Sequence, residues 1–347
     1  MAGPDGDEDG RISLGHGGGG RLSQQLIQEL LLPAFGPADG VLHDAALLPH
    51  QPGRLAFSTD SFVVRPLLFP GGDIGRLAVC GSVNDLAMAG ATPVALSLAL
   101  ILEEGLAIAA LRRVIASIRA TAEACGVPVV TGDTKVVERG QADGIYINTS
   151  AIGRLEGPLT IHPGAVRPGD AVLVSGDLGR HGLAILAARG ELGLSTDLES
   201  DLAPLLEPVR ALLAAGLTPH CLRDLTRGGL AGAIDEIARG AGCRIELEEP
   251  AIPLHPAVAG ACDLLGLDPL AMANEGRMVV LLPEPQAEAA LALLQRFQPQ
   301  ARRIGTVLGP LSRASPLERL HPVCLRGELG VRRPLELGSG EQLPRIC

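Results

Sequence analysis

Short apolar runs alternate with longer amphipathic segments through most of this chain. In the first half, the sequence predicts strands at residues 55–64, 93–102, 127–130 and 145–152, and helices at residues 74–89 and 106–125. In the second half, it predicts strands at residues 171–175, near Arg244 and at residues 278–282, and helices from His181, at residues 203–215, from Gly228 and at residues 286–296. Such alternation is typical of mixed α/β layers. We therefore predict an α/β (α+β) protein with mixed sheets.

The predicted organisation has four parts, because 347 residues are enough for two domains and two terminal segments remain. Residues 1–40 form a glycine-rich segment with a short helix at 21–32. Residues 41–160 form an N-terminal domain, and a Pro/Gly-rich linker at 163–169 leads to a C-terminal α/β domain at 165–315. Periodicity fades after Pro310, so we expect residues 316–347 to be a mobile tail with a hinge at Gly338, Ser339 and Gly340.

Composition excludes several classes of protein. Apolar residues make up 46% of the chain but aromatic residues only 2%, so the core is aliphatic and few rings are available to stack on bases. The net charge of −10 also argues against a nucleic-acid partner. No apolar run is long enough to cross a membrane, and the acidic, glycine-rich first residues do not resemble a signal peptide. Seven cysteines without Cys-x-x-Cys spacing favour a reducing environment, so we expect a soluble cytoplasmic protein.

The sequence printed here ends in Cys347, after Leu343, Pro344, Arg345 and Ile346. A thiol at the end of a mobile arm is a good nucleophile and is able to enter a pocket, so Cys347 is a candidate carrier of a reacting group. A cysteine in this place by chance is the alternative interpretation.

Lys135 is the single lysine among 29 basic residues, the others being arginine. A compact ammonium fits between phosphate oxygens where a planar guanidinium does not, so this exception indicates a functional position. A leftover surface lysine is the alternative.

Several aspartates stand in apolar surroundings or next to predicted strands. Asp85 follows Asn84 on an apolar helix, whereas Asp44, Asp60 and Asp133 adjoin apolar runs. A carboxylate is rarely buried without a partner, and carboxylates at strand ends suit a ligand cleft. As a set they predict Mg²⁺ ions that bridge phosphate oxygens; each alone is better explained as a cap or turn residue.

Two glycine-containing segments are candidate anion sites. Residues 15–20 satisfy the pattern G-x-G-x-x-G, but no strand precedes them, so they predict only backbone N–H groups that wrap phosphates, with a disordered tail as the alternative. Residues 223–229 place two arginines and two glycines at the start of a helix, where an Asp or Thr N-cap is the simpler explanation. Glu275 lies beside a predicted strand and is a candidate base or ion-pair partner. His16 is the one histidine in a suspected site, and no zinc spacing is present.

These segments together resemble the HypE carbamoyl dehydratases, hydrogenase maturation factors of the superfamily that includes aminoimidazole ribonucleotide synthetase and selenophosphate synthetase. The matching stretches lie at residues 15–20, 69–75, 83–87, 103–105, 131–137, 226–231, 273–276 and 343–347, and they span nearly the whole chain. The Pro-Arg-Ile-Cys ending is specific to this branch. Three positions depart from the usual motif: Ser82 replaces Thr, Leu225 replaces Pro, and Arg180 replaces Asp.

The resemblance implies a two-domain, aminoimidazole ribonucleotide synthetase-like fold that uses ATP and Mg²⁺. It implies that a carbamoyltransferase, HypF, loads a carboxamide on the Cys347 sulfur, and that the tail then enters the ATP site of the same chain. ATP phosphorylates the carboxamide oxygen, a base removes the nitrogen protons and phosphate leaves, which produces a thiocyanate. The cyanide then passes to the iron of a [NiFe]-hydrogenase through a HypC–HypD scaffold. A homodimer formed by the N-terminal sheets is also implied.

The same resemblance implies roles for individual residues. Lys135 and Glu275 act with Cys347 in catalysis, Lys135 by neutralising charge during transfer and Glu275 as the base. The implied metal ligands are Asp44, Asp60, Asp85, Asp133 and Asp224. The implied nucleotide-binding residues are Gly15, His16, Gly17, Gly18, Gly19, Gly20, Asn84, Thr134, Arg223, Arg227, Gly228 and Gly229.

Two alternatives stay open at this point. The chain is a kinase or synthetase of the same superfamily that acts on a free small molecule, or it is a nucleotide-binding scaffold that presents Cys347 without performing chemistry. The carboxylate set and the single lysine favour chemistry, and the cysteine at residue 347 disfavours a free substrate.

Overall fold

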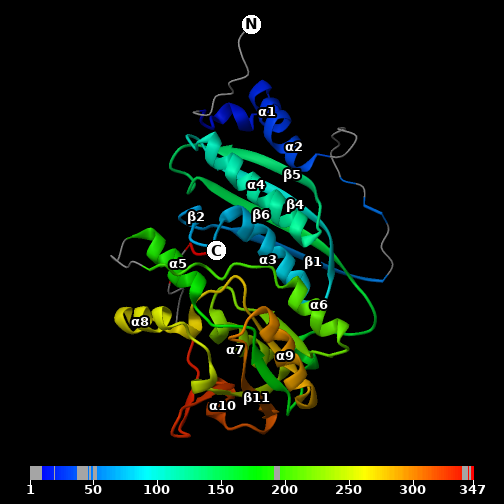
Figure 1. Ribbon diagram of the computed structural model, residues 1–347, viewed down its shortest axis with the longest axis vertical. Coiled ribbons are helices and arrows are strands. Elements are labelled where there is room, and N and C mark those ends of the chain that lie inside the picture. Colours follow the sequence, from blue (N-terminus) through cyan, green and yellow to red (C-terminus); the bar gives the residue numbers. More distant parts are fainter. Residues whose placement is uncertain are drawn as a thin grey trace.

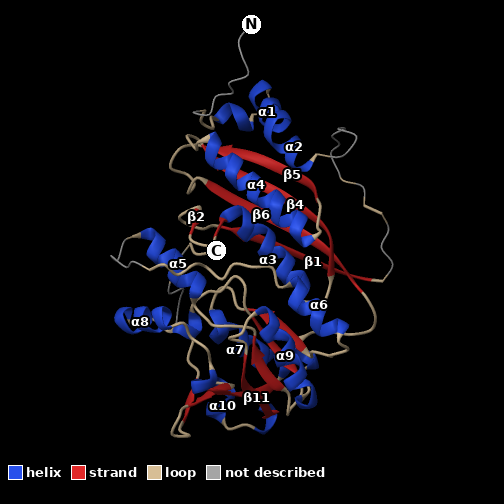
Figure 2. Ribbon diagram, in the orientation of Figure 1, coloured by secondary structure: helices blue, strands red, loops and turns tan. Residues whose placement is uncertain are grey.

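The computed structural model describes residues 10–18, 20–36, 46, 48–49, 53–190, 196–337, 343 and 345–347. Two sheets define an N-terminal and a C-terminal domain, one above the other along the long axis of the molecule (Figure 1). Helices cover the strands of both domains (Figure 2). The two-domain α/β architecture with mixed sheets predicted from the sequence is therefore present.

The N-terminal sheet has the strand order β1-β6-β4-β5. Only β4 and β5 are parallel, and the other two neighbouring pairs are antiparallel. The strands are β1 (Arg54–Phe62), β4 (Thr92–Glu103), β5 (Val129–Val137) and β6 (Ile145–Leu155), and a small hairpin is formed by β2 (Leu68–Phe69) and β3 (Gly72–Asp73).

Two helices cover one face of this sheet (Figure 1). They are α3 (Ile74–Met88) and α4 (Ile108–Cys125). Leu111, Val114, Ile115 and Ile118 form the apolar stripe of α4 and are buried, which is why this segment packs as a helix on the sheet. The chain before β1 forms α1 (Arg21–Leu26), a π-helical turn (Ile27–Leu31) and α2 (Leu32–Phe35), so the helix expected at 21–32 is interrupted.

The opposite face of the N-terminal sheet carries large apolar side chains that the described residues leave exposed. Phe57 is 70% exposed, Leu55 57% and Ile101 39%. Along β1 these side chains alternate with inward-facing ones such as Ser58 and Asp60. Among the described residues, β1 and β5 each pair on one side only, so both outer edges of this sheet are free.

The C-terminal sheet has the order β13-β12-β9-β11-β7-β10-β8. Its strands are β7 (Ala171–Val174), β8 (Cys221–Asp224), β9 (Cys243–Glu248), β10 (Met278–Leu282), β11 (Arg302–Pro310), β12 (Val323–Arg326) and β13 (Arg332–Pro334). The helices are α5 (Arg180–Arg189), α6 (Leu206–Ala214), α7 (Gly229–Ala241), α8 (Pro256–Leu265), α9 (Ala287–Phe297) and α10 (Pro316–Leu320).

One hydrophobic core continues through both domains. Alternate residues of the buried strands β7 and β10, such as Leu173 and Val280, join the core that also contains α3 and α4. Their neighbours, such as Val172 and Val279, join a second core beneath α7. Because both faces of these strands are buried, they read as unbroken apolar runs in the sequence.

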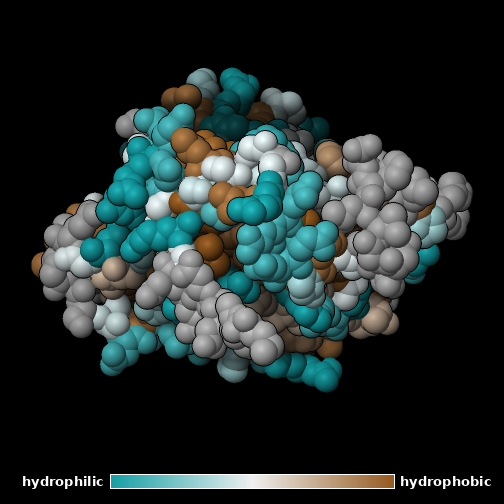
Figure 3. Space-filling model, turned by 90° about the horizontal axis from the view of Figure 1, so that it is seen from above, coloured by the Kyte–Doolittle hydropathy of each residue, from teal (hydrophilic) through white to brown (hydrophobic). Residues whose placement is uncertain are grey.

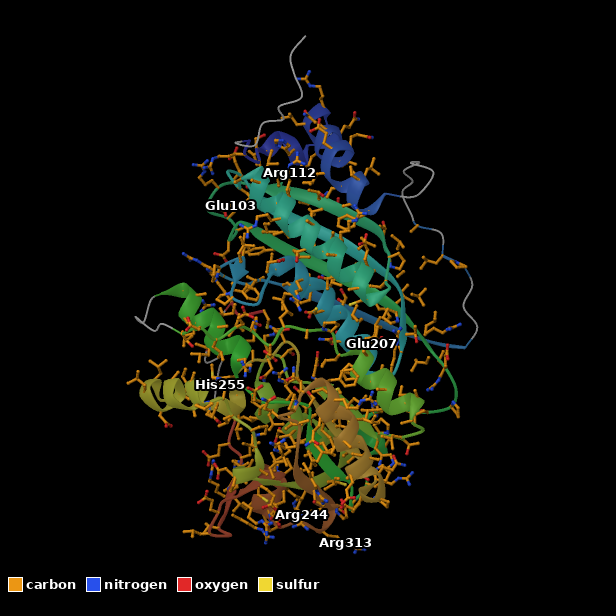
Figure 4. All side chains as sticks on the ribbon, viewed as in Figure 1. Glu103, Arg112, Glu207, Arg244, His255 and Arg313 are labelled. Carbon is orange, nitrogen blue, oxygen red and sulfur yellow. The ribbon has the colours of Figure 1, made fainter. Side chains whose placement is uncertain are left out.

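The expectation of a mobile tail from residue 316 is wrong for residues 316–334. Strand β12 pairs in parallel with β9, and its Val323 and Leu325 are buried. Charged pairs add to this attachment: Arg326 binds Glu248 with an Nε–Oε2 distance of 2.9 Å. The Ser315 N-cap holds the pKa of Glu318 down to about 2, first through backbone and side-chain hydrogen bonds and then through Arg244. Figure 4 places Arg244 and Arg313 at this end of the C-terminal domain.

Most predicted elements of the first domain are confirmed, but β5 extends to Val137 and so contains Asp133 and Lys135. In the second domain β8, α8 and β11 were not predicted. Viewed from the N-terminal end, hydrophobic residues lie in separate groups among hydrophilic ones (Figure 3). In the described part of the chain, no helix has both the length and the apolar character that a membrane crossing requires.

The attachment of β12 makes a stability prediction. Leu325→Ala removes a fully buried side chain, so we expect a loss of about 2–5 kcal/mol in the free energy of unfolding, measured by denaturant titration. Leu329→Ala is the matched control, because Leu329 is 94% exposed in the turn after β12 and its loss leaves no cavity. Equal midpoints for the two variants would mean that the segment is not part of the fold.

Candidate active site

Helix α3 carries Asp85 to the inner face of β1. Gly81 makes this approach possible, because a Cβ on it would lie 2.7 Å from the ring of Phe62. Because the helix lies so close to β1, Ser58 of β1 donates a hydrogen bond to the Asp85 carboxylate. Asp60 lies two residues further along the same inward-facing side of β1. The fold therefore brings two of the predicted carboxylates together.

Asp224, at the end of β8, adds a third carboxylate from the C-terminal domain. Helix α3 contacts β8, and Asp224 is buried beneath it. Burial, followed by the charge of Asp85 and with a smaller effect of Asp60, raises the pKa of Asp224 to about 7, although Arg223 lowers it. The pKa values of Asp60 and Asp85 are also raised, first by burial. These shifts show acidic groups that are held close together in a protected place.

The predicted anion segment lies next to this cluster. Arg223 and Arg227 act electrostatically on the aspartates, Arg223 on Asp85 and Arg227 on Asp60. Gly228 has φ +79° and Gly229 φ +57°, and a Cβ on Gly229 would meet two backbone carbonyls at 2.5 Å. Only glycine fits this tight entry into α7, which presents its positive end here.

Glu275 is the most deeply buried acid of the site. It is 2% exposed, and burial, followed by the charges of Asp201, Asp224 and Asp60, raises its pKa well above the ordinary value. The Asp201 carboxylate accepts the backbone N–H groups of Glu275 and Gly276, which fixes the loop. Within the described part of the chain, Glu275 Oε1 is buried and has no hydrogen-bond partner. A buried acceptor without a partner is positioned for a substrate proton.

Cys347 lies against Glu275. Burial, followed by the negative charge of Glu275, raises the pKa of the Cys347 thiol well above its usual value. Arg227 and Asp60 also act on this thiol. The end of the chain therefore reaches from the C-terminal domain into the acidic cluster, between the two domains (Figure 1).

Other predicted site residues lie at the far edge of the N-terminal sheet. Lys135 pairs with Asp133 at 3.1 Å on β5, and both side chains are more than half exposed. The backbone N–H of Thr134 is bound to Asp133. Two strands separate β5 from β1, so these groups lie about 14 Å from Asp60 within one chain. We predicted from the sequence that Asp133, Thr134 and Lys135 lie in one site with the other aspartates. The structure does not bring them together within a single copy.

The glycine segment accompanies β5. A Cβ on Gly17 would lie 2.8 Å from the backbone N of Val136, so the segment rests on the strand that carries Lys135. His16 hydrogen-bonds Ser13 through its side chain and holds Ser23 through its backbone carbonyl, which shapes the turn at Gly15–Gly18. Gly20 is the N-cap of α1. Gly19 and Asp44 lie outside the described residues.

Asn84 and Arg180 have structural partners. The Asn84 amide is buried and bonded at both ends to the backbone at residues 203–205, so it connects the domains and is not turned toward the carboxylates. Arg180 pairs with Asp177 at 2.6 Å, and Asp177 also holds Arg277 at 2.8 Å. The unusual arginine in this loop thus belongs to an internal ion network.

We did not predict from the sequence that His181 belongs to the site. Its Nε2 lies 2.7 Å from the Ile346 carbonyl and its Nδ1 lies 2.8 Å from Ser200 Oγ. Burial lowers the pKa of His181, so it is held as the neutral ring. No local motif marks it, because its partners come from segments far apart in the chain.

The acidic cluster fits a cation that is shared with phosphate oxygens. In the part of the chain that the structure describes, no group of three His, Cys, Asp or Glu side chains is arranged to hold a metal by itself. Mg²⁺ commonly takes only one or two carboxylates together with phosphates and waters. The pKa values of Asp60, Asp85 and Asp224 are all raised, so their ionised forms are unfavourable in the absence of a cation. A bound cation would stabilise these ionised carboxylates.

Comparison with known proteins identifies the family. The AIR synthase related protein N-terminal domain matches residues 42–155, and the corresponding C-terminal domain matches residues 167–312. Carbamoyl dehydratase HypE of Rhodobacter capsulatus is 50% identical over 344 residues, 98% of this chain and 99% of that protein. The chain belongs to the HypE family. The Escherichia coli (strain K12) HypE is 46% identical over 349 residues, 97% and 99% of the two chains.

Solved structures of the HypE family agree with this assignment. The crystal structure of HypE in complex with ATP has a TM-score of 0.89 at 46% identity, and the match covers 96% of this chain and 99% of that one. A HypE–HypF complex has a TM-score of 0.77 at 40% identity, covering 90% and 99%. A thiamine-monophosphate kinase at 21% identity and a TM-score of 0.60 shares the fold. The family and fold predicted from the motifs are confirmed.

The clustered carboxylates predict a stability difference that depends on pH. Because folding raises the pKa of Asp85, its ionised form destabilises the native state, and stability is lost as the pH rises through that folded pKa. We expect Asp85→Asn, which still accepts the Ser58 hydrogen bond, to raise the melting temperature at pH 8 in EDTA by a few degrees, as measured by calorimetry.

At a pH below about 3 the gain should vanish, because the carboxylate is then largely protonated in both the folded and the unfolded state. Asp263→Asn, at an exposed position on α8, is the matched control and should change the melting temperature at neither pH. A lower melting temperature for Asp85→Asn at pH 8 would contradict the proposed repulsion.

Proposed function

We propose that this chain dehydrates a carboxamide carried on Cys347 to a thiocyanate, at the expense of ATP. Carbamoyl dehydration is the activity of the family to which the chain belongs. The observation that carries the proposal for these residues is that Cys347 lies against the buried Glu275, close enough for each side chain to shift the pKa of the other. Cys347–S–CO–NH₂ and ATP give Cys347–S–CN, ADP and phosphate, and the carboxamide oxygen leaves in the phosphate.

The two steps place different demands on the protein. In the first, the carboxamide oxygen attacks the γ-phosphorus of ATP, ADP leaves and the nitrogen loses one proton. In the second, the C–O bond breaks, the nitrogen loses its other proton and phosphate departs. Phosphorylation converts a poor leaving group into a good one. Glu275 is the base, because its raised pKa makes its ionised form a strong acceptor and its Oε1 has no partner among the described residues.

ATP is the nucleotide, in agreement with the ATP complex of a HypE that is 46% identical. We infer that Arg227 and the positive end of α7 bind its phosphates, with Gly228 and Gly229 allowing close approach. Asp60, Asp85 and Asp224 would hold Mg²⁺, which when bound neutralises phosphate charge. Bringing the phosphate close to Cys347 makes the transfer effectively intramolecular.

We infer that HypF loads the carboxamide, since a HypE of 40% identity has been crystallised with HypF. The docked Cys347 is only partly exposed and lies against Glu275, so we infer that loading requires the end of the chain to leave this position. The thiocyanate then supplies a cyanide ligand for the iron of a [NiFe]-hydrogenase. A HypC–HypD scaffold is the proposed acceptor.

We infer a homodimer that completes the site. The uncovered sheet face exposes Phe57 and Leu55, and both β1 and β5 have free edges among the described residues. Pairing of β1 with β5 of a second copy, and the reverse, would satisfy both edges with two-fold symmetry. It would also bring Lys135 and the glycine segment of one copy to the strand that holds Asp60 in the other. Lys135 would then neutralise the transferring phosphoryl group.

The carrier role of Cys347 has a direct test. Cys347→Ala should still bind ATP but form no thiocyanate after incubation with HypF, carbamoyl donor and ATP, because the acceptor sulfur is gone. Glu-C cleavage after Glu341 releases residues 342–347, in which the thiocyanate is one water lighter than the carboxamide, as mass spectrometry will show.

Cys324→Ala, which removes another partly exposed free thiol, is the control and should form the thiocyanate normally. A thiocyanate on any other cysteine of Cys347→Ala would refute the carrier role. Undiminished ATP turnover in that variant would instead favour a kinase that acts on a free small molecule.

Subunit mixing tests the shared site. Lys135→Ala and Cys347→Ala should each be inactive alone, since each lacks one part of the machinery. After exchange of subunits at a 1:1 ratio, about a quarter of wild-type thiocyanate formation should return, because half of the dimers are mixed and each has one complete site. Single-turnover mass spectrometry gives the yield. No recovery in a mixture shown to contain mixed dimers would place Lys135 in its own chain's site.

A further inference from the structure

The last residues of the chain are held by contacts that the reaction itself does not require. The Arg345 carbonyl accepts hydrogen bonds from Arg189 at 2.7 Å, at the end of α5, and from the Arg65 backbone N–H at 3.3 Å. Arg189 in turn binds the Arg65 carbonyl at 3.0 Å, which fixes the two donors relative to each other. These hydrogen bonds are made to backbone atoms of the arm and not to its side chains.

His181 holds the next peptide group. The Ile346 carbonyl is an acceptor only, so His181 Nε2 carries the proton and donates at 2.7 Å. Nδ1 is then the acceptor for the Ser200 hydroxyl at 2.8 Å. The ring edge of Phe69 packs against His181 at a centroid distance of 5.4 Å, and Ile346 itself is 4% exposed. The ring has one tautomer and one orientation, and its bond lies one peptide group from Cys347.

A charged pair on the side chain of Arg345 also holds the arm. Arg345 pairs with Asp143 at 2.9 Å, and Tyr146 of β6 donates to the second oxygen of the same carboxylate at 3.2 Å. Arg345 has φ +55°, the left-handed region, and is the one non-glycine residue of the described chain with a positive φ. Such a conformation persists only where surrounding contacts impose it. Ile346, the residue after this bend, is buried.

We propose that His181 is a positioning residue for the dehydration, which sets the Cys347 sulfur against Glu275 through the Ile346 carbonyl, and that Asp143 latches the arm by its pair with Arg345. The inference rests on the proposed function. Its basis is the short chain of contacts from Ser200 through His181 to the peptide before Cys347. A shift of the arm by one residue would move the sulfur by about 3.5 Å, beyond reach of Glu275.

The latch has opposite effects on the two halves of the cycle. Docking holds the partly exposed Cys347 against Glu275, which favours dehydration and hinders loading from outside. Weakening the latch should therefore expose Cys347 and speed its modification, while it slows thiocyanate formation on protein that is already loaded. A merely structural defect would not produce these opposite changes in the rate of Cys347 modification and the rate of thiocyanate formation.

The first experiment measures the alkylation rate of Cys347 in the full chain with iodoacetamide, resolved by mass spectrometry of residues 342–347. We expect Asp143→Asn and His181→Ala to react at least about tenfold faster than wild type. His181→Gln, whose amide donates from a similar position, should react at close to the wild-type rate. Glu123→Gln, which breaks the Arg119 pair on α4, and His220→Gln, which removes the Asp170 contact, are matched controls. Equal rates in Asp143→Asn and wild type would overturn the latch.

The second experiment separates docking from chemistry. Single-turnover dehydration of preloaded protein should be at least about tenfold slower in His181→Ala at saturating ATP, should recover in His181→Gln, and should show an unchanged half-saturating ATP concentration. Equal dehydration rates in His181→Ala and wild type would overturn the positioning role. If wild type forms no thiocyanate but the alkylation rates differ as stated, the proposed function fails and the docking contacts stand.

Tyr146 provides an independent readout, because the chain has no tryptophan and this is its one tyrosine. Its hydroxyl shares Asp143 with the arm, so deletion of residues 345–347 should change the tyrosine emission of wild type. The same deletion in Asp143→Asn should change it much less. An emission that is indifferent to the deletion in wild type would show that Asp143 does not hold the arm.

Discussion

The site depends on the close packing of α3 between the two domains. Gly81 lets this helix approach β1, where Asp85 meets Ser58, and the same helix rests against β8, which carries Asp224. Bulk at Gly81 would meet the ring of Phe62 and so move the helix, with Asp85, away from β1. The acidic cluster is therefore a product of helix packing, and its repulsion is compensated by the apolar core around it.

Much of this arrangement was predictable from the sequence. The apolar surroundings of Asp85 indicated a buried carboxylate, and the motif around Glu275 indicated an acid near a strand, because desolvated charges need a reason to persist. The reach of β5 was missed since Gly132 and Asp133 resemble a turn. In the structure Gly132 sits where a Cβ would lie 2.2 Å from the Leu98 carbonyl, so the strand continues. Lys135 consequently faces outward at a sheet edge.

The remaining differences come from contacts between distant segments. Strand β12 is too short to show a period, and its partner β9 lies far back in the chain. His181 likewise has no sequence signal, since Ser200 and Ile346 are its partners. The proposed pairing of two copies would involve contacts between chains, which neither the pattern of one sequence nor the fold of one copy contains. The buried acids could thus be predicted from the residues around them in the sequence. The way Cys347 is held depends on tertiary contacts and could not.

The core shared by the two domains limits how the molecule moves. Leu202, Leu205, Leu206 and Val209 continue it from the C-terminal domain to α3, and the Asn84 amide connects the two backbones. A hinge between rigid lobes needs an interface that parts at little cost, and this one would expose aliphatic surface to water. We therefore expect the motion that admits a loaded cysteine to involve the arm that carries Cys347, and not a movement of one domain against the other.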